Sequence, residues 1–186
     1  LAIASVDSEG RITEFEPHIT AGTALVSIMH ANNETGVIQP IEAIGRACRN
    51  SGVLFHTDAI QSAGKMSIDV SEMPVDLLSL SAHKLNGPKG VGALYMRHGV
   101  SLSEQAIGGT QERGRRGGTE NVAGIVGFGT ACELAQPKIK TDHEHLTQLY
   151  DSLQRGILEK IPGTWLNGSP THRLPHILNI GFANTE

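Results

Sequence analysis

Apolar residues gather in four short runs between residues 24 and 97, and each run has the length and composition of a β-strand. The runs span residues 24–30, 53–58, 75–81 and 91–97. Most of them do not alternate between apolar and polar positions, which is the pattern of strands covered on both faces. This pattern predicts a mainly parallel sheet flanked by helices.

The segment between the first two runs has a helical pattern instead. In residues 40–52, Pro40 stands at a favourable first helical position, apolar side chains recur at Ile41, Ile44 and Ala47, and Gly52 can end the helix. A strand, a helix and a second strand in this order form a β-α-β unit. We therefore expect an α/β fold.

Two longer helices and a second β region are expected further along the chain. Asn121 can cap a helix that ends near Gln136. Its internal glycines, at 124, 127 and 129, each cost about 1 kcal/mol relative to alanine, so another part of the protein should approach this backbone closely. The face of the next helix is formed by Leu146, Leu149, Leu153, Ile157 and Ile161. Residues 164–170 and 176–182 then indicate a small β region.

Composition and charge narrow the possible partners. The 186 residues are 39% hydrophobic and 18% charged, which is ordinary for a globular protein with a sizeable core. A net charge of -4 and the absence of an apolar run near the ~18 residues of a membrane span argue against nucleic acid and membrane partners. Two cysteines without CxxC spacing and no visible signal peptide indicate a reducing, cytoplasmic compartment.

Lys84 stands where the third apolar run gives way to a glycine-rich loop. It lies beside His83 and before glycines 87, 90 and 92, at the carboxyl end of an expected strand, where open α/β sheets bind ligands. The alternative is a solvated surface lysine. A phosphate-binding P-loop is discounted, because the loop lacks the GK[ST] signature and precedes a strand.

A second polar group, at the end of the run 53–58, favours a ligand-binding role for Lys84 over that of a surface lysine. Asp58 would be costly to leave unpaired in a sheet crevice, so it needs a cationic partner, and a protonated pyridinium nitrogen is one. Pyridoxal 5'-phosphate (PLP) requires a lysine, an acid and small hydrogen-bond donors around its phosphate. Those groups are available in Asp58, Gln61, Ser81, His83 and Lys84. The alternative for Asp58 is an ordinary turn or cap aspartate.

Four motifs carry a resemblance to a known family. They are MHANNETG at 29–36, HTDAIQS at 56–62, SAHKLNGPKGVGALY at 81–95 and GGTQERGRRGGTEN at 108–121. In order and spacing they resemble the NifS/IscS-type cysteine desulfurases, which are fold-type I PLP enzymes of the class-V aminotransferase superfamily. The resemblance covers nearly the whole chain, and four linked motifs are far more specific than any one of them.

The resemblance implies a role for each matching residue. Lys84 forms the Schiff base with PLP, Asp58 pairs with the pyridinium nitrogen, and Gln61 hydrogen-bonds the phenolic oxygen of the ring. Ser81 and His83 hold the phosphate, and Lys84 with His83 are the expected catalytic residues.

Two further residues of the family pattern lie outside these strand ends. Asn33 is expected near the phenolic oxygen and the substrate carboxylate. Thr119 is expected to reach the phosphate of the other subunit's PLP, which implies a homodimer, although it could instead cap the helix that begins near Asn121.

The implied reaction converts L-cysteine to L-alanine and passes the sulfur, as a persulfide, to acceptor proteins such as an iron–sulfur scaffold. The family's nucleophilic cysteine has no counterpart here, so we expect a fragment that lacks both ends and is inactive alone. Residues 1–138 should belong to the large PLP domain, and residues 139–186 to a linking helix and the start of the small domain. Both Cys48 and Cys132 are expected to be buried small hydrophobes.

Other assignments stay open. A selenocysteine lyase or another class-V aminotransferase would use the same Lys84 and Asp58, and a dimerisation remnant without catalysis is a further alternative. The arginines at 113, 115 and 116 are expected to serve a dimer interface and to order their loop. No metal site is expected, because His143 and His145 are two residues apart in a helix and point in different directions.

Overall fold

The computed structural model describes residues 1–185 and contains one larger sheet and one smaller one. In chain order its helices and strands are η1 (Glu16–His18), β1 (Leu25–Met29), α1 (Ile41–Asn50), β2 (Leu54–Asp58), β3 (Leu77–Ser81), η2 (Ala82–Leu85), β4 (Gly92–Met96), α2 (Gln111–Gly114), α3 (Val122–Ala135), η3 (Gln136–Lys138), α4 (Ile139–Lys160), β5 (Thr164–Leu166) and β6 (Ile180–Phe182). The prefix η marks a 3-10 helix.

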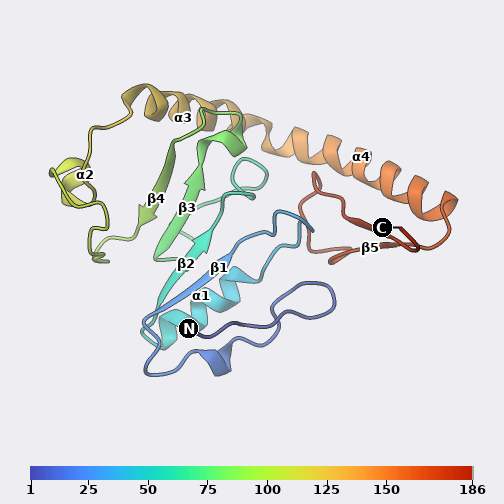
Figure 1. The fold of residues 1–186 in the computed structure, drawn as a ribbon, viewed down its shortest axis with the longest axis horizontal. Helices are drawn as coiled ribbons and strands as arrows, with labels where there is room; N and C mark the ends of the chain where they lie inside the picture. The colour runs from blue at the N-terminus through green and yellow to red at the C-terminus, as the bar shows by residue number, and fades with distance from the viewer. Residues whose placement is uncertain (186) are drawn as a thin grey trace.

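The larger sheet has the strand order β1-β2-β3-β4 (Figure 1). The first three strands are parallel, as the apolar runs predicted, and β4 is antiparallel to β3. The turn between β3 and β4 is too short for the crossover that a parallel neighbour requires. As a result, β4 begins at the edge of the sheet where β3 ends.

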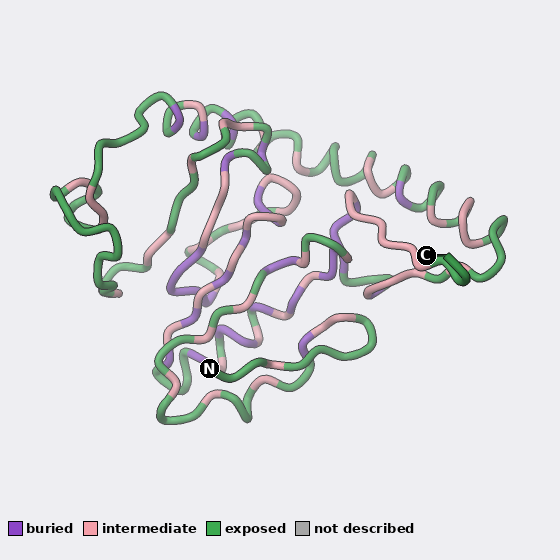
Figure 2. Tube along the Cα trace, in the orientation of Figure 1, coloured by how far each residue is buried: buried purple, intermediate pink, exposed green. Residues whose placement is uncertain are grey.

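Helix α1 packs against β2 and closes the main core, as expected for the predicted β-α-β unit. Its Ile41, Ile44 and Cys48 join Phe55 of β2 and Leu78 of β3 in one buried cluster. Buried positions recur along β2, the start of β3 and α1, whereas the edge strands β1 and β4 have none (Figure 2). A Cβ at Gly45 would overlap the backbone oxygen of Pro74, so the glycine allows this close approach.

Asp76 connects three strands just before β3 begins. Its Oδ2 accepts a hydrogen bond of 2.8 Å from the backbone N–H of Phe55, and its Oδ1 accepts one of 2.6 Å from Nε of Arg97. The carboxylate is buried, and an ion pair with a partly exposed arginine offsets part of the cost of its burial.

Helices α3, η3 and α4 follow one another along one side of the molecule (Figure 1). Asn121 caps α3 as predicted, because its side-chain oxygen accepts a 3.1 Å hydrogen bond from the N–H of Gly124. The close approach expected at the helix glycines occurs at Gly127, where a Cβ would meet the ring of Pro88. At Gly129 no neighbouring atom of the described chain lies within 4 Å, so that part of the expectation is wrong for residues 1–185.

The second β region is the antiparallel pair β5-β6, as expected from residues 164–170 and 176–182. It lies beside α4, away from the larger sheet (Figure 1). The segment between its strands returns to residues 36–38, where the N–H of Leu174 donates to the oxygen of Gly36 at 2.9 Å. The segment between β5 and β6 is thereby joined to the loop that follows β1.

Within residues 1–185, no helix is both long enough and apolar enough to cross a membrane.

Candidate functional site

The predicted site residues gather at the edge of the sheet where β2 and β3 end. Asp58 is the last residue of β2, and Ser81 is the last residue of β3. Parallel strands end at the same edge, and in this sheet Asp58 is paired with Met29 on one side and Ser79 on the other. The sheet therefore places a carboxylate between two strands that both lead into polar loops.

Asp58 begins the tight turn that follows β2. Its Oδ1 accepts a 2.9 Å hydrogen bond from the N–H of Ile60, as an aspartate in a turn commonly does. Within residues 1–185, Oδ2 has no hydrogen-bond partner, so one carboxylate oxygen is available to a ligand. Gln61 lies half-buried in the same turn.

The helix η2 explains how Lys84 is displayed. Ala82 and Leu85 are buried against Phe128 and Ala131 of α3, which anchors this short helix. His83 and Lys84, between them, are exposed. The structure thus places the lysine on a fixed support with its side chain in solvent, and its immediate surroundings in the described chain would equally suit a surface lysine.

Ser81 and His83 act as one unit. The hydroxyl Oγ of Ser81 and the ring Nδ1 of His83 are hydrogen-bonded at 2.8 Å. This bond fixes the imidazole beside the strand end, one residue before Lys84. A hydroxyl and an imidazole in this arrangement can donate hydrogen bonds to an anion such as a phosphate.

Asn33 lies in the loop that follows β1 and is exposed. The loop is shaped by its neighbour Asn32, whose Oδ1 accepts hydrogen bonds of 2.9 Å from the N–H groups of Glu34 and Thr35. The backbone of the loop is therefore ordered although the side chain of Asn33 has no hydrogen bond within residues 1–185.

Thr119 lies in the loop before α3, close to the turn between β3 and β4. With Gly90, Gly92 and Arg116 it lines a cavity of about 330 Å³. It does not cap the next helix, because Asn121 makes that cap. The cap alternative for Thr119 is therefore excluded.

Of the three arginines expected to order this loop, Arg116 does so directly. Its guanidinium donates to the backbone oxygens of Gly117 at 3.2 Å and Gly118 at 2.6 Å. The preceding Glu112 and Arg113 have left-handed backbones, with φ of 50° and 59°. Such backbones are uncommon outside glycine, so the path of this loop depends on the contacts around it.

Sequence reasoning missed three histidines near this edge, and His30 is the first. It follows β1, its N–H donates to the oxygen of Asp58 at 2.8 Å, and its Nδ1 is hydrogen-bonded to Oγ of Ser62 at 2.9 Å. Burial lowers its pKa to about 4, so the ring is neutral at pH 7. Its position in the motif MHANNETG, at a strand end, was the available signal.

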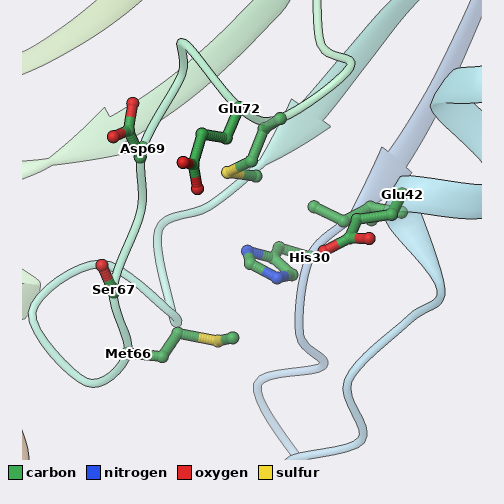
Figure 3. A pocket seen from close by; sticks show the side chains of 8 residues that line it. His30, Glu42, Met66, Ser67, Asp69 and Glu72 are labelled. Carbon is green, nitrogen blue, oxygen red and sulfur yellow. The ribbon is translucent and has the colours of Figure 1, made fainter.

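His30 also faces a cavity of about 390 Å³ (Figure 3). The other labelled side chains around this cavity are Glu42, Met66, Ser67, Asp69 and Glu72. The cavity lies beside α1 and the loop after β2, and none of the residues predicted for the site lines it.

His56 spans the sheet beneath Asp58. Its two ring nitrogens are hydrogen-bonded to Oγ of Ser27 at 2.7 Å and to Oγ of Ser79 at 2.8 Å, so one imidazole joins three parallel strands. Burial lowers its pKa, and the nearby carboxylate of Asp58 opposes that shift.

His176 precedes β6 and is the third of these histidines. Burial lowers its pKa, and the positive charges of Lys65 and Lys84 lower it further. The residue therefore brings the segment between β5 and β6 within electrostatic range of the lysine predicted to be catalytic. Nothing in the sequence pattern signals this proximity.

The two cysteines differ from each other, and one expectation is wrong. Cys48 is fully buried in α1, as expected. Cys132 is exposed on α3. This helix is apolar on several sides, so its pattern could not show which side packs on η2, and Ala131 takes that position. Loss of contact with water raises the pKa of both thiols, and the negative charge of Asp76 raises that of Cys48 further, which keeps them in the less reactive protonated form.

Both helix histidines considered as metal ligands, His143 and His145, are exposed on α4. Across residues 1–185, no three histidine, cysteine, aspartate or glutamate side chains are grouped closely enough to hold a metal ion.

Comparison with known proteins gives consistent results over the whole chain. The family model described as "Aminotransferase class-V" matches residues 1–186. A protein of Trichormus variabilis named cysteine desulfurase 2 is 50% identical over 184 residues, which are 98% of this chain and 46% of that protein. A Clostridium botulinum protein named cysteine desulfurase IscS is 49% identical over 185 residues, covering 97% of this chain and 47% of the relative.

Solved structures agree with the fold. A NifS-like protein from Rickettsia africae has a TM-score of 0.93 and 32% sequence identity, covering 98% of this chain and 52% of that one. A structure described as SspA in complex with cysteine has a TM-score of 0.75 and 40% identity, covering 91% of this chain and 46% of that one. The chain spans about half the length of the relatives it matches.

Proposed function

Since the chain belongs to the class-V aminotransferase family, we propose that the whole protein is a PLP-dependent cysteine desulfurase. It would convert L-cysteine to L-alanine and pass the sulfur on as a persulfide. The observation that carries this proposal is the placement of Asp58 and Lys84 at one edge of the sheet, in a chain about half identical to proteins named cysteine desulfurases.

The side chains at this edge fit PLP by their chemistry. Asp58 has a free carboxylate oxygen for the ring nitrogen, the Ser81–His83 pair offers donors for the phosphate, and Lys84 offers a primary amine. Gln61, in the turn after β2, would serve the phenolic oxygen. When bound, PLP supplies an electron sink that stabilises negative charge on the substrate Cα.

Each protein group has a distinct task in the proposed reaction. The neutral amine of Lys84 takes the proton from the Cα of cysteine, while His83 keeps the phosphate end fixed beside it. Asn33 orients the substrate carboxylate. Thr119 would serve the site of a second subunit, so the active form is a homodimer.

The sulfur needs a thiolate that can reach the substrate. Attack requires a separation of roughly 3 to 3.5 Å, which a thiol packed in a helix core cannot reach. Cys48 is excluded by its burial in α1. On α3, Ala131 packs against η2, the short helix that carries Lys84. The neighbouring Cys132 does not take part in this contact and is exposed. We therefore assign sulfur transfer to neither cysteine of this chain.

The remaining parts of the proposal concern the setting of the reaction. Residues 1–138 form part of the large PLP domain, and residues 139–186 form the linking helix and the start of the small domain. The protein acts in the cytoplasm and delivers sulfur to acceptor proteins such as an iron–sulfur scaffold.

The first test replaces the lysine in the full-length protein. Lys84→Ala should lower alanine formation from cysteine by about 10³-fold or more, because the group that binds PLP and moves the proton is lost. Lys89→Ala, on the same exposed turn, is the matched control and should retain activity. Alanine and sulfide are assayed together, and borohydride reduction followed by peptide mapping locates the lysine bound to PLP. An adduct at another lysine, with turnover retained in Lys84→Ala, would overturn the assignment.

The second test separates charge from size at the other strand end. Asp58→Asn keeps the shape of the side chain but cannot hold the ring nitrogen protonated, so turnover should fall by about 10²-fold or more while bound PLP decreases less. Turnover within a few-fold of the unaltered protein would contradict the pairing. Supplying selenocysteine in parallel decides between a desulfurase and a selenocysteine lyase.

A further inference from the structure

Arg173 is a buried cation held almost entirely by backbone oxygens. It lies between β5 and β6 and is 9% exposed. One terminal nitrogen, Nη2, donates to the oxygen of Thr35 at 2.7 Å and to that of Ile177 at 2.8 Å. The other, Nη1, donates more weakly to the oxygen of Ser169 at 3.4 Å. A single side chain therefore connects the loop after β1 to both sides of the β5–β6 segment.

No carboxylate compensates this charge within residues 1–185. Instead, the guanidinium carbon lies 4.8 Å from the centre of the Tyr150 ring on α4, a cation–π distance. Burial lowers the pKa of the arginine. Burying a cation without a carboxylate partner destabilises the fold. Its place in the fold therefore requires an interaction that only the guanidinium can make and that a smaller apolar residue could not.

That interaction is with the backbone of residues 33–38, whose conformation it helps to fix. The backbone oxygen of Thr35, which accepts from Arg173, lies two residues from Asn33, and the side-chain Nδ2 of Asn179 donates to the oxygen of Glu34 at 3.2 Å. The N–H of Ile38 donates to the oxygen of His172 at 2.8 Å. The N–H of Leu174 donates to the oxygen of Gly36 at 2.9 Å. The loop is thus held from one side by its own Asn32 turn and from the other by the segment around Arg173.

We propose that Arg173 is a positioning residue, which fixes the loop bearing Asn33 and so couples the β5–β6 unit to the substrate end of the site. The inference rests on the proposed function for the role of Asn33. Arg173 itself touches neither substrate nor PLP in this proposal. It acts through the carbonyl of Thr35, and its effect therefore passes through Asn33.

The first measurement does not depend on activity. In Arg173→Met, amide hydrogen exchange of residues 34–38 in the full-length protein should rise about tenfold or more, because the opening of the loop is no longer opposed by the guanidinium. Strands β2 and β3 should keep their protection. Arg46→Met is the matched control, since Arg46 is exposed on α1 and pairs only with Glu42. Unchanged exchange in the loop would overturn the proposal.

The second measurement is a double-mutant cycle on cysteine turnover. Arg173→Met and Asn33→Ala should each raise the KM for cysteine about tenfold, with a smaller effect on kcat, and the double variant should resemble Asn33→Ala alone. Additive effects would show that Arg173 does not act through Asn33. Arg173→Lys, which keeps the charge but not the paired donors, should restore part of the loss.

A milder change protects the test against misfolding. If Arg173→Met does not fold, Tyr150→Leu removes the ring that supports the guanidinium and should shift loop exchange and KM in the same direction by a smaller factor. An unaltered protein without cysteine turnover would overturn the proposed function, whereas the exchange result would still decide the role of Arg173 in the loop.

Discussion

The burial of His30 at the edge of the sheet makes the stability of the protein depend on pH. Its ring is hydrogen-bonded to Ser62 and is 4% exposed, and its backbone is bonded to Asp58. Burial lowers its pKa from 6.5 to about 4. Between these two values the unfolded chain binds a proton at this position and the folded chain does not.

We therefore expect the free energy of unfolding to fall as the pH is lowered through this window. From pH 7.5 to pH 5 the contribution of His30 is about 2 kcal/mol, because the unfolded state binds more protons throughout this range. Urea denaturation of the full-length protein and of His30→Gln measures it. His56 and His176 add a loss of the same sign, so the difference between the two proteins isolates His30. Parallel pH curves for the two proteins would contradict the assignment.

The two cysteines give a second prediction at this scale. Cys48→Ala removes a fully buried sulfur from the core and should lower the free energy of unfolding by about 1 kcal/mol. Cys132→Ser, at an exposed position, should change stability little. Both variants should still form alanine and persulfide from cysteine, as measured by amino-acid analysis and cyanolysis. Loss of sulfur transfer in either variant would place the nucleophile within this chain.

At the scale of the elements, a glycine allows helix α1 to approach the neighbouring backbone closely. Gly45 faces the backbone of Pro74 and the ring of Phe55 so closely that a methyl group would overlap the Pro74 oxygen. An open helix position behaves differently. At Gly156 of α4, no neighbouring atom of the described chain lies within 4 Å.

The same substitution should therefore have opposite signs in the two helices. Gly156→Ala should stabilise the protein by up to about 1 kcal/mol, because alanine favours the helix. Gly45→Ala should destabilise it by about 1 to 3 kcal/mol, because overpacking outweighs that gain. Thermal unfolding of both variants provides the measurement. A stabilised Gly45→Ala would mean that α1 can move away from Pro74 at little cost.

Sequence periodicity was sufficient for the elements whose partners are close along the chain. The strand runs, α1 and the cap at Asn121 were predictable because each depends on local spacing. The sides of α3 were not, since its residues are apolar nearly all round and the exposure of Cys132 depends on what covers the helix. At the candidate site, the positions of Asp58 at the end of β2 and of Lys84 just after β3 were predictable from the apolar runs. Arg173 could not, because its acceptor at Thr35 is 138 residues away in the sequence.

At the scale of the whole molecule, one junction joins the smaller sheet to the loop after β1 of the larger sheet. Leu174 is 1% exposed there, next to Arg173, and its N–H is bonded to the oxygen of Gly36. A two-stranded sheet alone is marginally stable in water, so β5-β6 depends on this junction and on α4. The loop after β1 and the small sheet should therefore open together.

Leu174→Ala tests that cooperativity. The cavity left in the junction should cost about 2 to 5 kcal/mol, and it should raise hydrogen exchange in residues 35–38 and in β5-β6 by similar factors. Exchange at the centre of β2 should change less. Faster exchange in only one of the two regions would show that they open independently.

The span of the Arg173–Thr35 contact also has a consequence during protein synthesis. The ribosome delivers Thr35 long before Arg173, since 138 positions separate them. At about 5 to 20 residues per second, the loop waits roughly 7 to 28 s for the side chain that holds it. During that interval β2, which carries Asp58, and η2, which carries Lys84, are synthesised, while the loop bearing Asn33 still lacks its contact with Arg173. Under the proposed function, the groups assigned to the cofactor are synthesised before the contact that fixes the substrate loop, which gives assembly of the site a direction in time.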